Sequence, residues 1–131
     1  METVKYLKGD LLHGGGCSLK GNIMASYYDL VMMFGKPVYE GVGDKITTEF
    51  SVNYEATEED GNVITGNFRV YDWYFSRNLN DSSATTQWNI GGLDVLDFEA
   101  AKQAQSQYED TDIRYSGDAA CLLDGELVCL S

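Results

Sequence analysis

The amino-acid sequence predicts an α+β domain: an antiparallel sheet of about four to five strands, two helices packed on one face, and a C-terminal β-hairpin. Two segments place apolar residues at the spacing of a helix, and others alternate apolar and polar residues as strands do. The segments follow the order strand, helix, two or three meandering strands, helix and hairpin, which is typical of helices on an antiparallel sheet. With 131 residues, 44% of them hydrophobic, the chain is expected to form one domain with a buried core.

Residues 1–16 are predicted to precede the core, as an N-terminal segment and a connector made flexible by the glycines at 14–16. The core is expected to span residues 17–108. It begins with a strand at 17–24, in which Leu19, Gly21 and Ile23 share one side. Residues 109–131 are assigned to an acidic linker and the terminal hairpin.

The first helix is predicted to begin after Ser26, a favoured N-cap residue. Asp29, three residues later, can bond back to the Ser26 amide as in a capping box. Gly35 suits the left-handed end of a helix, and Pro37 prevents its continuation. The stripe expected to bury against a sheet is Tyr27, Leu30, Val31 and Phe34.

Two long strands are expected next, as an antiparallel pair joined by a turn at Asp60 and Gly61. The first strand, residues 45–54, has one face formed by Ile46, Thr48, Phe50, Val52 and Tyr54. In the second, residues 62–75, that face continues with Ile64, Phe68 and Val70. The opposite face carries Tyr71, Trp73 and Phe75, and this change of face predicts a bulge or a two-sided strand near Asp72.

The polar residues 76–86 predict an exposed loop, followed by a short strand at 87–92 with Trp88 and Ile90 on one face. Asp94 is placed to cap the second helix. The residues that share one face of that helix are Phe98, Ala101, Gln105 and Tyr108. In the terminal hairpin, centred on Asp124 and Gly125, Cys121 and Cys129 are diagonal rather than opposite, which makes a disulfide between them doubtful.

The formal net charge of −12, from 21 acidic and 9 basic residues, bounds the kinds of partner. Repulsion from phosphate argues against direct binding of DNA or RNA. The charge favours basic partners, among them the nucleic-acid-binding clefts of other proteins, although solubility alone is an alternative explanation.

An odd number of cysteines, three, argues against a disulfide framework and for reduced thiols. No apolar run has the length of a signal peptide, and none approaches the roughly 18 residues of a membrane span. We therefore expect a cytoplasmic protein with no membrane partner.

No catalytic, cofactor or metal site is predicted. The HGGG run at residues 13–16 matches the oxyanion loop of lipases, but the chain lacks their G-x-S-x-G elbow and a second histidine. A phosphate loop would need a strand before the glycines and a helix after them. One histidine and three scattered cysteines lack zinc spacing.

Three weaker alternatives stay open. His13 and Cys17 could form a dyad, although the glycines leave it poorly preorganised. The acidic run at residues 58–60 could hold a cation or be a solvated turn. Glu49 and Asp72 could act as an acid–base pair, or be an exposed carboxylate and a buried one satisfied by hydrogen bonds.

Aromatic and acidic side chains are the more informative features. A cluster of aromatic residues between 71 and 88 is too large for one face of a small sheet to hide, so it is either core or a patch that meets a protein or a nucleobase. Three acids after the second helix could imitate a line of phosphates, or could simply solvate the helix end. The predicted partner-binding residues are Tyr71, Trp73, Tyr74, Trp88, Glu109, Asp110 and Asp112.

Four landmarks lie between residues 17 and 108: SLKGNIMA leading into SYYDLVMMFGKP, then DKITTEF, VYDWY and QWNIGG. Together they resemble a family of small accessory proteins of tailed bacteriophages. That family has tryptophan where this chain has Phe50, and the tail after Glu109 has no counterpart in it. The resemblance implies a phage accessory protein, and by analogy one that counteracts a host defence.

The sequence therefore predicts a non-enzymatic phage-type protein that acts in the host bacterial cytoplasm. It would inhibit a host defence protein with a basic nucleic-acid-binding surface, such as a CRISPR effector or nuclease, through its acidic and aromatic surface. One alternative is a sponge for a nucleotide immune signal, with basic groups from Lys20, Lys45, Arg69 and Arg77. Another is a virion or assembly component, including a homodimer paired through the terminal hairpin.

Overall fold

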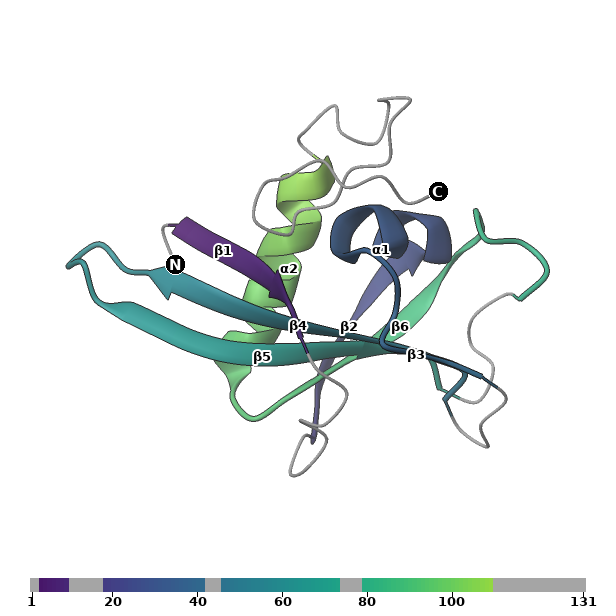
Figure 1. Cartoon of the computed structure of the whole chain (residues 1–131), viewed down its shortest axis with the longest axis horizontal. Helices are drawn as coiled ribbons and strands as arrows, with labels where there is room; N and C mark the ends of the chain where they lie inside the picture. Colours follow the sequence, from purple (N-terminus) through teal and green to yellow (C-terminus); the bar gives the residue numbers. More distant parts are fainter. Residues whose placement is uncertain (1–2, 10–17, 42–45, 74–78, 110–131) are drawn as a thin grey trace.

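The fold is α+β, as predicted: an antiparallel sheet of six strands with two helices (Figure 1). It is given by a computed structural model, which describes residues 3–9, 18–41, 46–73 and 79–109. In chain order the elements are β1 (Thr3–Lys8), β2 (Ser18–Ser26), α1 (Tyr27–Phe34), β3 (Tyr39–Glu40), β4 (Thr48–Thr57), β5 (Val63–Tyr71), β6 (Thr85–Gly92) and α2 (Val95–Glu109).

The sheet has the strand order β1-β4-β5-β6-β2, and every pair is antiparallel. β1 pairs with the second half of β4 and the short β3 with its first two residues, so both lie along one edge of β4. β2 pairs with β6 at the far side. The sheet therefore joins the start of the chain to its middle through β4 (Figure 1).

The first strand lies earlier in the chain than predicted. In β1, Val4 and Tyr6 are buried while Thr3 and Lys5 are exposed, the alternation of a half-buried strand. Tyr6 also donates a hydrogen bond of 3.0 Å to the Ala100 carbonyl of α2. Residues 3–8 thus belong to the sheet rather than to a segment that precedes the core, and β1 and β3 raise the strand number above the predicted four to five.

The central pair, β4 and β5, follows the predicted alternation. Phe50 pairs with Val70 and Val52 with Phe68, and all four side chains are buried. The register runs without a shift from Glu49–Tyr71 to Thr57–Val63, so the predicted bulge is not found in this pair. β5 ends at Tyr71, and the next residue, Asp72, bonds to Thr47 and Thr48 at the start of β4.

Both helix starts are capped as predicted. The Ser26 hydroxyl accepts a 3.0 Å hydrogen bond from the Asp29 amide, and the Asp94 carboxylate accepts one of 3.0 Å from the Leu96 amide. Gly35 ends α1 with a φ of 76°, a conformation that favours glycine. Of the predicted stripe, Leu30 and Phe34 are buried and Tyr27 and Val31 are partly buried against the core. Met32 and Met33 are buried as well, which widens the buried face of α1 beyond the prediction.

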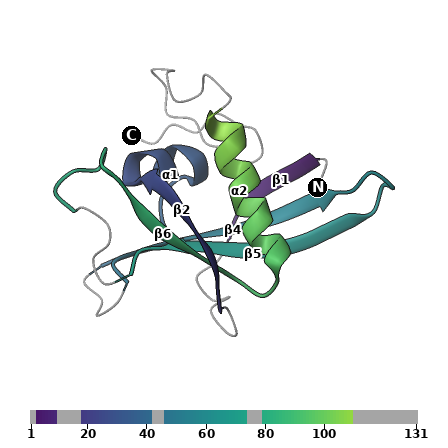
Figure 2. The same cartoon turned by 180° about the vertical axis from the view of Figure 1, so that it is seen from behind.

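The core lies on the apolar side of the sheet. Phe34 of α1 contacts Phe68 edge-on, with ring centroids 5.6 Å apart, and also packs beside Phe50. α2 brings small buried residues against the strands, including Ala100 and Ala104, so its axis can approach the sheet closely (Figure 2).

Several predicted features fall outside the described residues. These are the terminal hairpin, the HGGG run with Cys17, and the first part of the 76–86 loop; residues 79–83 of that loop are exposed. Across the described ranges, no helix is both long and apolar enough to cross a membrane.

Candidate binding surface

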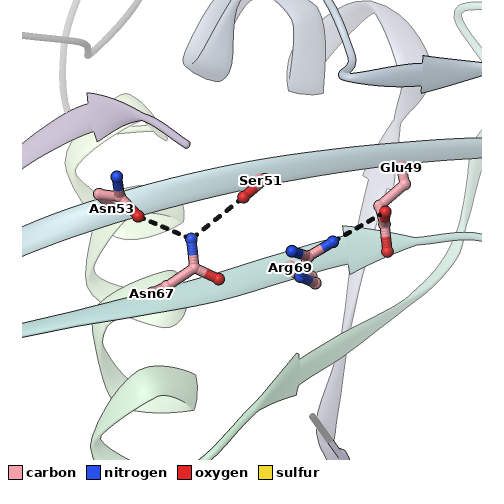
Figure 3. Close-up of polar contacts among 5 residues, drawn as sticks. All are labelled: Glu49, Ser51, Asn53, Asn67 and Arg69. Atoms are coloured by element: carbon pink, nitrogen blue, oxygen red, sulfur yellow. Dashed lines mark hydrogen bonds and ion pairs between the residues drawn. The ribbon is translucent and has the colours of Figure 1, made fainter. Parts of the chain in front are cut away.

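The outward side chains of β4 and β5 form a polar face opposite the core. Cross-strand partners project to the same side of a sheet, and three successive pairs on this face are Glu49–Tyr71, Ser51–Arg69 and Asn53–Asn67. Figure 3 shows the polar side chains of this face pointing toward one another across the two strands.

A charged pair lies at the centre of the polar face. Arg69 Nη1 donates to Glu49 Oε2 over 3.0 Å, and the two side chains are only 4% and 15% exposed (Figure 3). Moving both charges out of water has a cost, which their attraction offsets when the geometry is good. The Arg69 charge is therefore balanced within the sheet.

The pairing of Arg69 with Glu49 weakens the prediction that the chain is a sponge for a nucleotide signal. Of its four basic residues, Arg69 is paired with a carboxylate and Lys20 is half-buried on β2. Lys45 and Arg77 lie outside the described residues. The described part of the chain thus offers no basic cluster for a phosphate on this face.

Asn67 links the two strands beside the charged pair. Its amide nitrogen donates to Ser51 Oγ over 3.0 Å and to Asn53 Oδ1 over 2.8 Å (Figure 3). These bonds pair the Asn67 amide nitrogen with two oxygens of β4, whereas Asn67 Oδ1 is buried and has no hydrogen-bond partner among the described residues. The centre of the polar face is thus a hydrogen-bonded network.

The Asp72 carboxylate is held by hydrogen bonds at the start of β4 and does not bond to the partner of Glu49. Its carboxylate accepts hydrogen bonds from the amides of Thr47 and Thr48, over 2.8 and 2.9 Å, and from the Thr47 hydroxyl over 2.5 Å. Glu49 bonds to Arg69 instead. The two carboxylates considered as an acid–base pair therefore have separate sets of partners.

The predicted aromatic residues divide between surface and core. Trp73 is 40% exposed, and its ring meets that of the half-buried Tyr71 in a T-shaped contact with centroids 6.2 Å apart. Trp88 is fully buried: its indole nitrogen donates to the Ala25 carbonyl over 3.0 Å, and its ring packs edge-on against Phe50. The expectation that Trp88 meets a partner is therefore corrected, and Tyr74 lies outside the described residues.

Of the three predicted acids, the structure describes Glu109, which is exposed and is the last residue of α2. Asp110 and Asp112 lie outside the described residues. The last turn of α2 contains no basic residue. A carboxylate at this end is disfavoured by the negative end of the helix dipole, so this charge does not serve helix stability.

The acidic turn at residues 58–60 is organised by hydrogen bonds. Both carboxylate oxygens of Asp60 accept from Asn62, from its backbone amide over 3.0 Å and from its side chain over 2.9 Å. Within the described ranges, no group of three or more His, Cys, Asp or Glu side chains is placed to hold a metal ion.

A pocket between α1, β2 and α2 was not predicted from the sequence. Its volume is about 240 Å³, and its walls include Met24, Asp29, Met33, Gln105, Tyr108 and Glu109. The Tyr108 hydroxyl donates to Asp29 Oδ1 over 3.0 Å across 79 positions of sequence. Only the folded chain brings these residues together, so no local pattern could have indicated the pocket.

Asp97 is a further structural feature that was not predicted from the sequence. It is buried in the first turn of α2 and accepts hydrogen bonds from the amides of Leu93 and Asp94 and from the Tyr54 hydroxyl. The signal was present, because Asp94 and Asp97 have the spacing of a capping box. This residue joins α2 to the sheet.

Comparisons with known proteins give no relative from which to transfer a function. A scan against protein-family models, a search of curated proteins and a search of solved structures each found no match. Function is therefore inferred from the geometry of the chain itself.

Proposed function

We propose that this chain is a non-catalytic binding protein that attaches to a basic surface of a partner protein. The partner would be a host defence component, and the chain a bacteriophage accessory protein that inhibits it. The observation that carries the binding role is the exposed Trp73, held against Tyr71 at the end of the polar face.

Trp73 has the properties of a binding anchor. A large aromatic ring left 40% exposed contributes more free energy when a partner covers it than it does in the isolated chain. Tryptophan and tyrosine are enriched among the residues that dominate protein–protein affinity. The contact with Tyr71 restricts the Trp73 ring, which lowers the entropy lost on binding.

The positions of the two helices also favour the surface around Trp73 as a binding site. Phe34 of α1 contacts Phe50 and Phe68, and Asp97 of α2 bonds to Tyr54, all on the apolar side of β4 and β5. We infer that both helices cover this one face. Neither helix then covers the end of the opposite face, where Trp73 lies against Tyr71.

Charge supports a basic partner. The net charge of −12 favours association with positive surfaces, and the exposed Glu109 places one acid at a helix end where it does not stabilise the helix. A basic nucleic-acid-binding protein has the complementary charge. The sponge for a nucleotide signal is less well supported, because Glu49 balances the charge of Arg69.

The test is capture from a bacterial host lysate, read by mass spectrometry. Wild-type protein, Trp73→Ala and the matched control Tyr28→Ala are immobilised; Tyr28 is an aromatic residue of α1 that is 52% exposed. We expect wild type and control to retain the same basic nucleic-acid-handling protein and Trp73→Ala to lose it. Raising salt from about 0.1 M to about 0.5 M should release it, because screening weakens exposed charge pairs.

Two results would contradict the proposal. Equal retention by Trp73→Ala and wild type would remove Trp73 from the interface. Retention that high salt leaves unchanged would show that the partner is not held by its charge.

A further inference from the structure

We propose that the pocket between α1, β2 and α2 binds the guanidinium group of an arginine side chain on the partner protein. The pocket has a volume of about 240 Å³, which suits one long side chain better than a drug-sized ligand. The assignment to a partner rests on the proposed function, whereas the choice of guanidinium rests on the contacts of the pocket itself.

Two hydrogen-bond donors of the pocket are already directed at protein acceptors. The Tyr108 hydroxyl donates to Asp29 Oδ1 over 3.0 Å, and the Gln105 amide nitrogen donates to the Met24 carbonyl over 2.6 Å. What these groups then present to a ligand is mainly oxygen: the Asp29 carboxylate, which can accept about four hydrogen bonds, and the Gln105 carbonyl. A guanidinium group, with five N–H donors and no acceptor, is complementary to such a lining.

The charge of the pocket also selects a cation. Asp29 and Glu109 are its two charged lining residues, and no Lys, Arg or His is among the described residues that form it. The negative end of the α2 dipole lies at Glu109 and adds to this potential. Asp29 is in the first turn of α1, where the dipole favours its charge, and Tyr108 holds it in place.

The apolar walls suit an arginine stem. Both methionines are among the lining residues; Met33 is buried, while Met24 is 56% exposed on β2. Thioethers adapt to the shape of a partner and pack well against methylene groups. Arginine fits better than lysine, because its planar fork can bond to a carboxylate and a carbonyl at once.

A metal ion is a poorer occupant. Hard divalent cations take six or more oxygen ligands, commonly with several carboxylates. The pocket offers two carboxylates, and the described part of the chain contains no group of three metal-binding side chains. An organic cation needs fewer ligands and uses the methionine walls as well.

The test is an NMR titration of protein labelled with ¹³C at the methionine methyl groups. The probes are a blocked Gly-Arg-Gly tripeptide, its citrulline isostere, which has nearly the same shape and no charge, and free arginine. We expect the arginine peptide to shift the Met24 and Met33 methyl signals in a saturable way, with a dissociation constant on the order of millimolar. Met32, which is buried outside this pocket, is the internal control and should not move.

Matched variants locate the charge that binds. Glu109→Gln should weaken the arginine peptide by about threefold to tenfold, whereas Glu99→Gln, an exposed acid on the same helix, should not change its affinity. Asp29→Asn should weaken it more, and its fold is checked by the unchanged Met32 signal. Because Glu109 is exposed, its variant keeps the test decisive even where Asp29→Asn unfolds.

Three outcomes would overturn the inference. They are equal binding of the citrulline and arginine peptides, no shift of Met24 and Met33, and equal affinity of Glu109→Gln and wild type. Tighter binding of free arginine than of the blocked peptide would overturn the assignment to a partner protein. Any of these could occur while lysate capture through Trp73 succeeds, so failure of the pocket is distinguishable from failure of the proposed function.

Discussion

The two faces of the β4–β5 pair use the same strands in opposite ways. On one face Phe50, Val52 and Phe68 are buried among aromatic rings and need no hydrogen bond. On the other, Ser51 and Arg69 are nearly as buried, and each depends on a polar neighbour. Burial alone therefore does not reveal what a face contributes: we expect the apolar face to supply stability and the polar face to supply specificity of pairing.

The largest expected effect is on the apolar face. Phe68 is fully buried between Phe34, Tyr6 and Tyr54, so Phe68→Ala leaves a cavity and should lower the free energy of unfolding by about 3–5 kcal/mol. Urea denaturation followed by circular dichroism measures this change. Thr65→Ala, an exposed position on the same strand, is the control and should stay within about 0.5 kcal/mol of wild type. Similar losses in both variants would break the comparison.

The next effect concerns the join between the apolar face and α2. Asp97→Ala removes the carboxylate that accepts hydrogen bonds from the Leu93 and Asp94 amides and from the Tyr54 hydroxyl. It should lower the free energy of unfolding by about 2–4 kcal/mol. Glu99→Ala, exposed on the same helix, should cost far less. An equal melting temperature for the two variants would show that Asp97 does not join the helix to the sheet.

The charged pair of the polar face sharpens the contrast. Glu49→Gln replaces the carboxylate beside the mostly buried Arg69 with a neutral amide, which leaves the Arg69 charge without an opposite charge from Glu49. The free energy of unfolding should fall by about 1–3 kcal/mol. Replacing both residues with apolar ones, as Glu49→Leu and Arg69→Met, should recover most of that loss, because no charge is then left inside. A double variant as unstable as the sum of its single changes would indicate that this face supplies stability like the other.

Features that depend on residues close together in the sequence were predicted, and features that depend on distant residues were not. The alternation of β4 and the caps at Ser26 and Asp94 were predicted because neighbouring residues determine them. Trp88 was assigned to the wrong environment, since alternation shows which residues share a face but not which face is covered. β1 was missed because it has only two buried side chains, and it is defined by pairing with a strand some 50 positions later.

The smallest effect, and the one most specific in its conditions, is the dependence of stability on alkaline pH. Burial raises the pKa of the Tyr54 hydroxyl above its ordinary value of 10.0, and the hydrogen bond to Asp97 raises it further. The unfolded chain then loses this proton near pH 10 while the folded chain keeps it, so the contribution of Tyr54 to stability is present below pH 10 and is lost as pH rises through the folded pKa.

Tyr54→Phe should lower the free energy of unfolding by about 1 kcal/mol at pH 7 through the lost hydrogen bond, and the difference in stability from wild type should narrow above pH 10. Urea midpoints measured from pH 7 to 11 test this, and Tyr6→Phe, whose pKa burial also raises, should narrow in the same sense. A gap that is constant with pH would show that the Tyr54 proton is not held by the apolar face, which would remove the distinction between a face that excludes charge and one that pairs it.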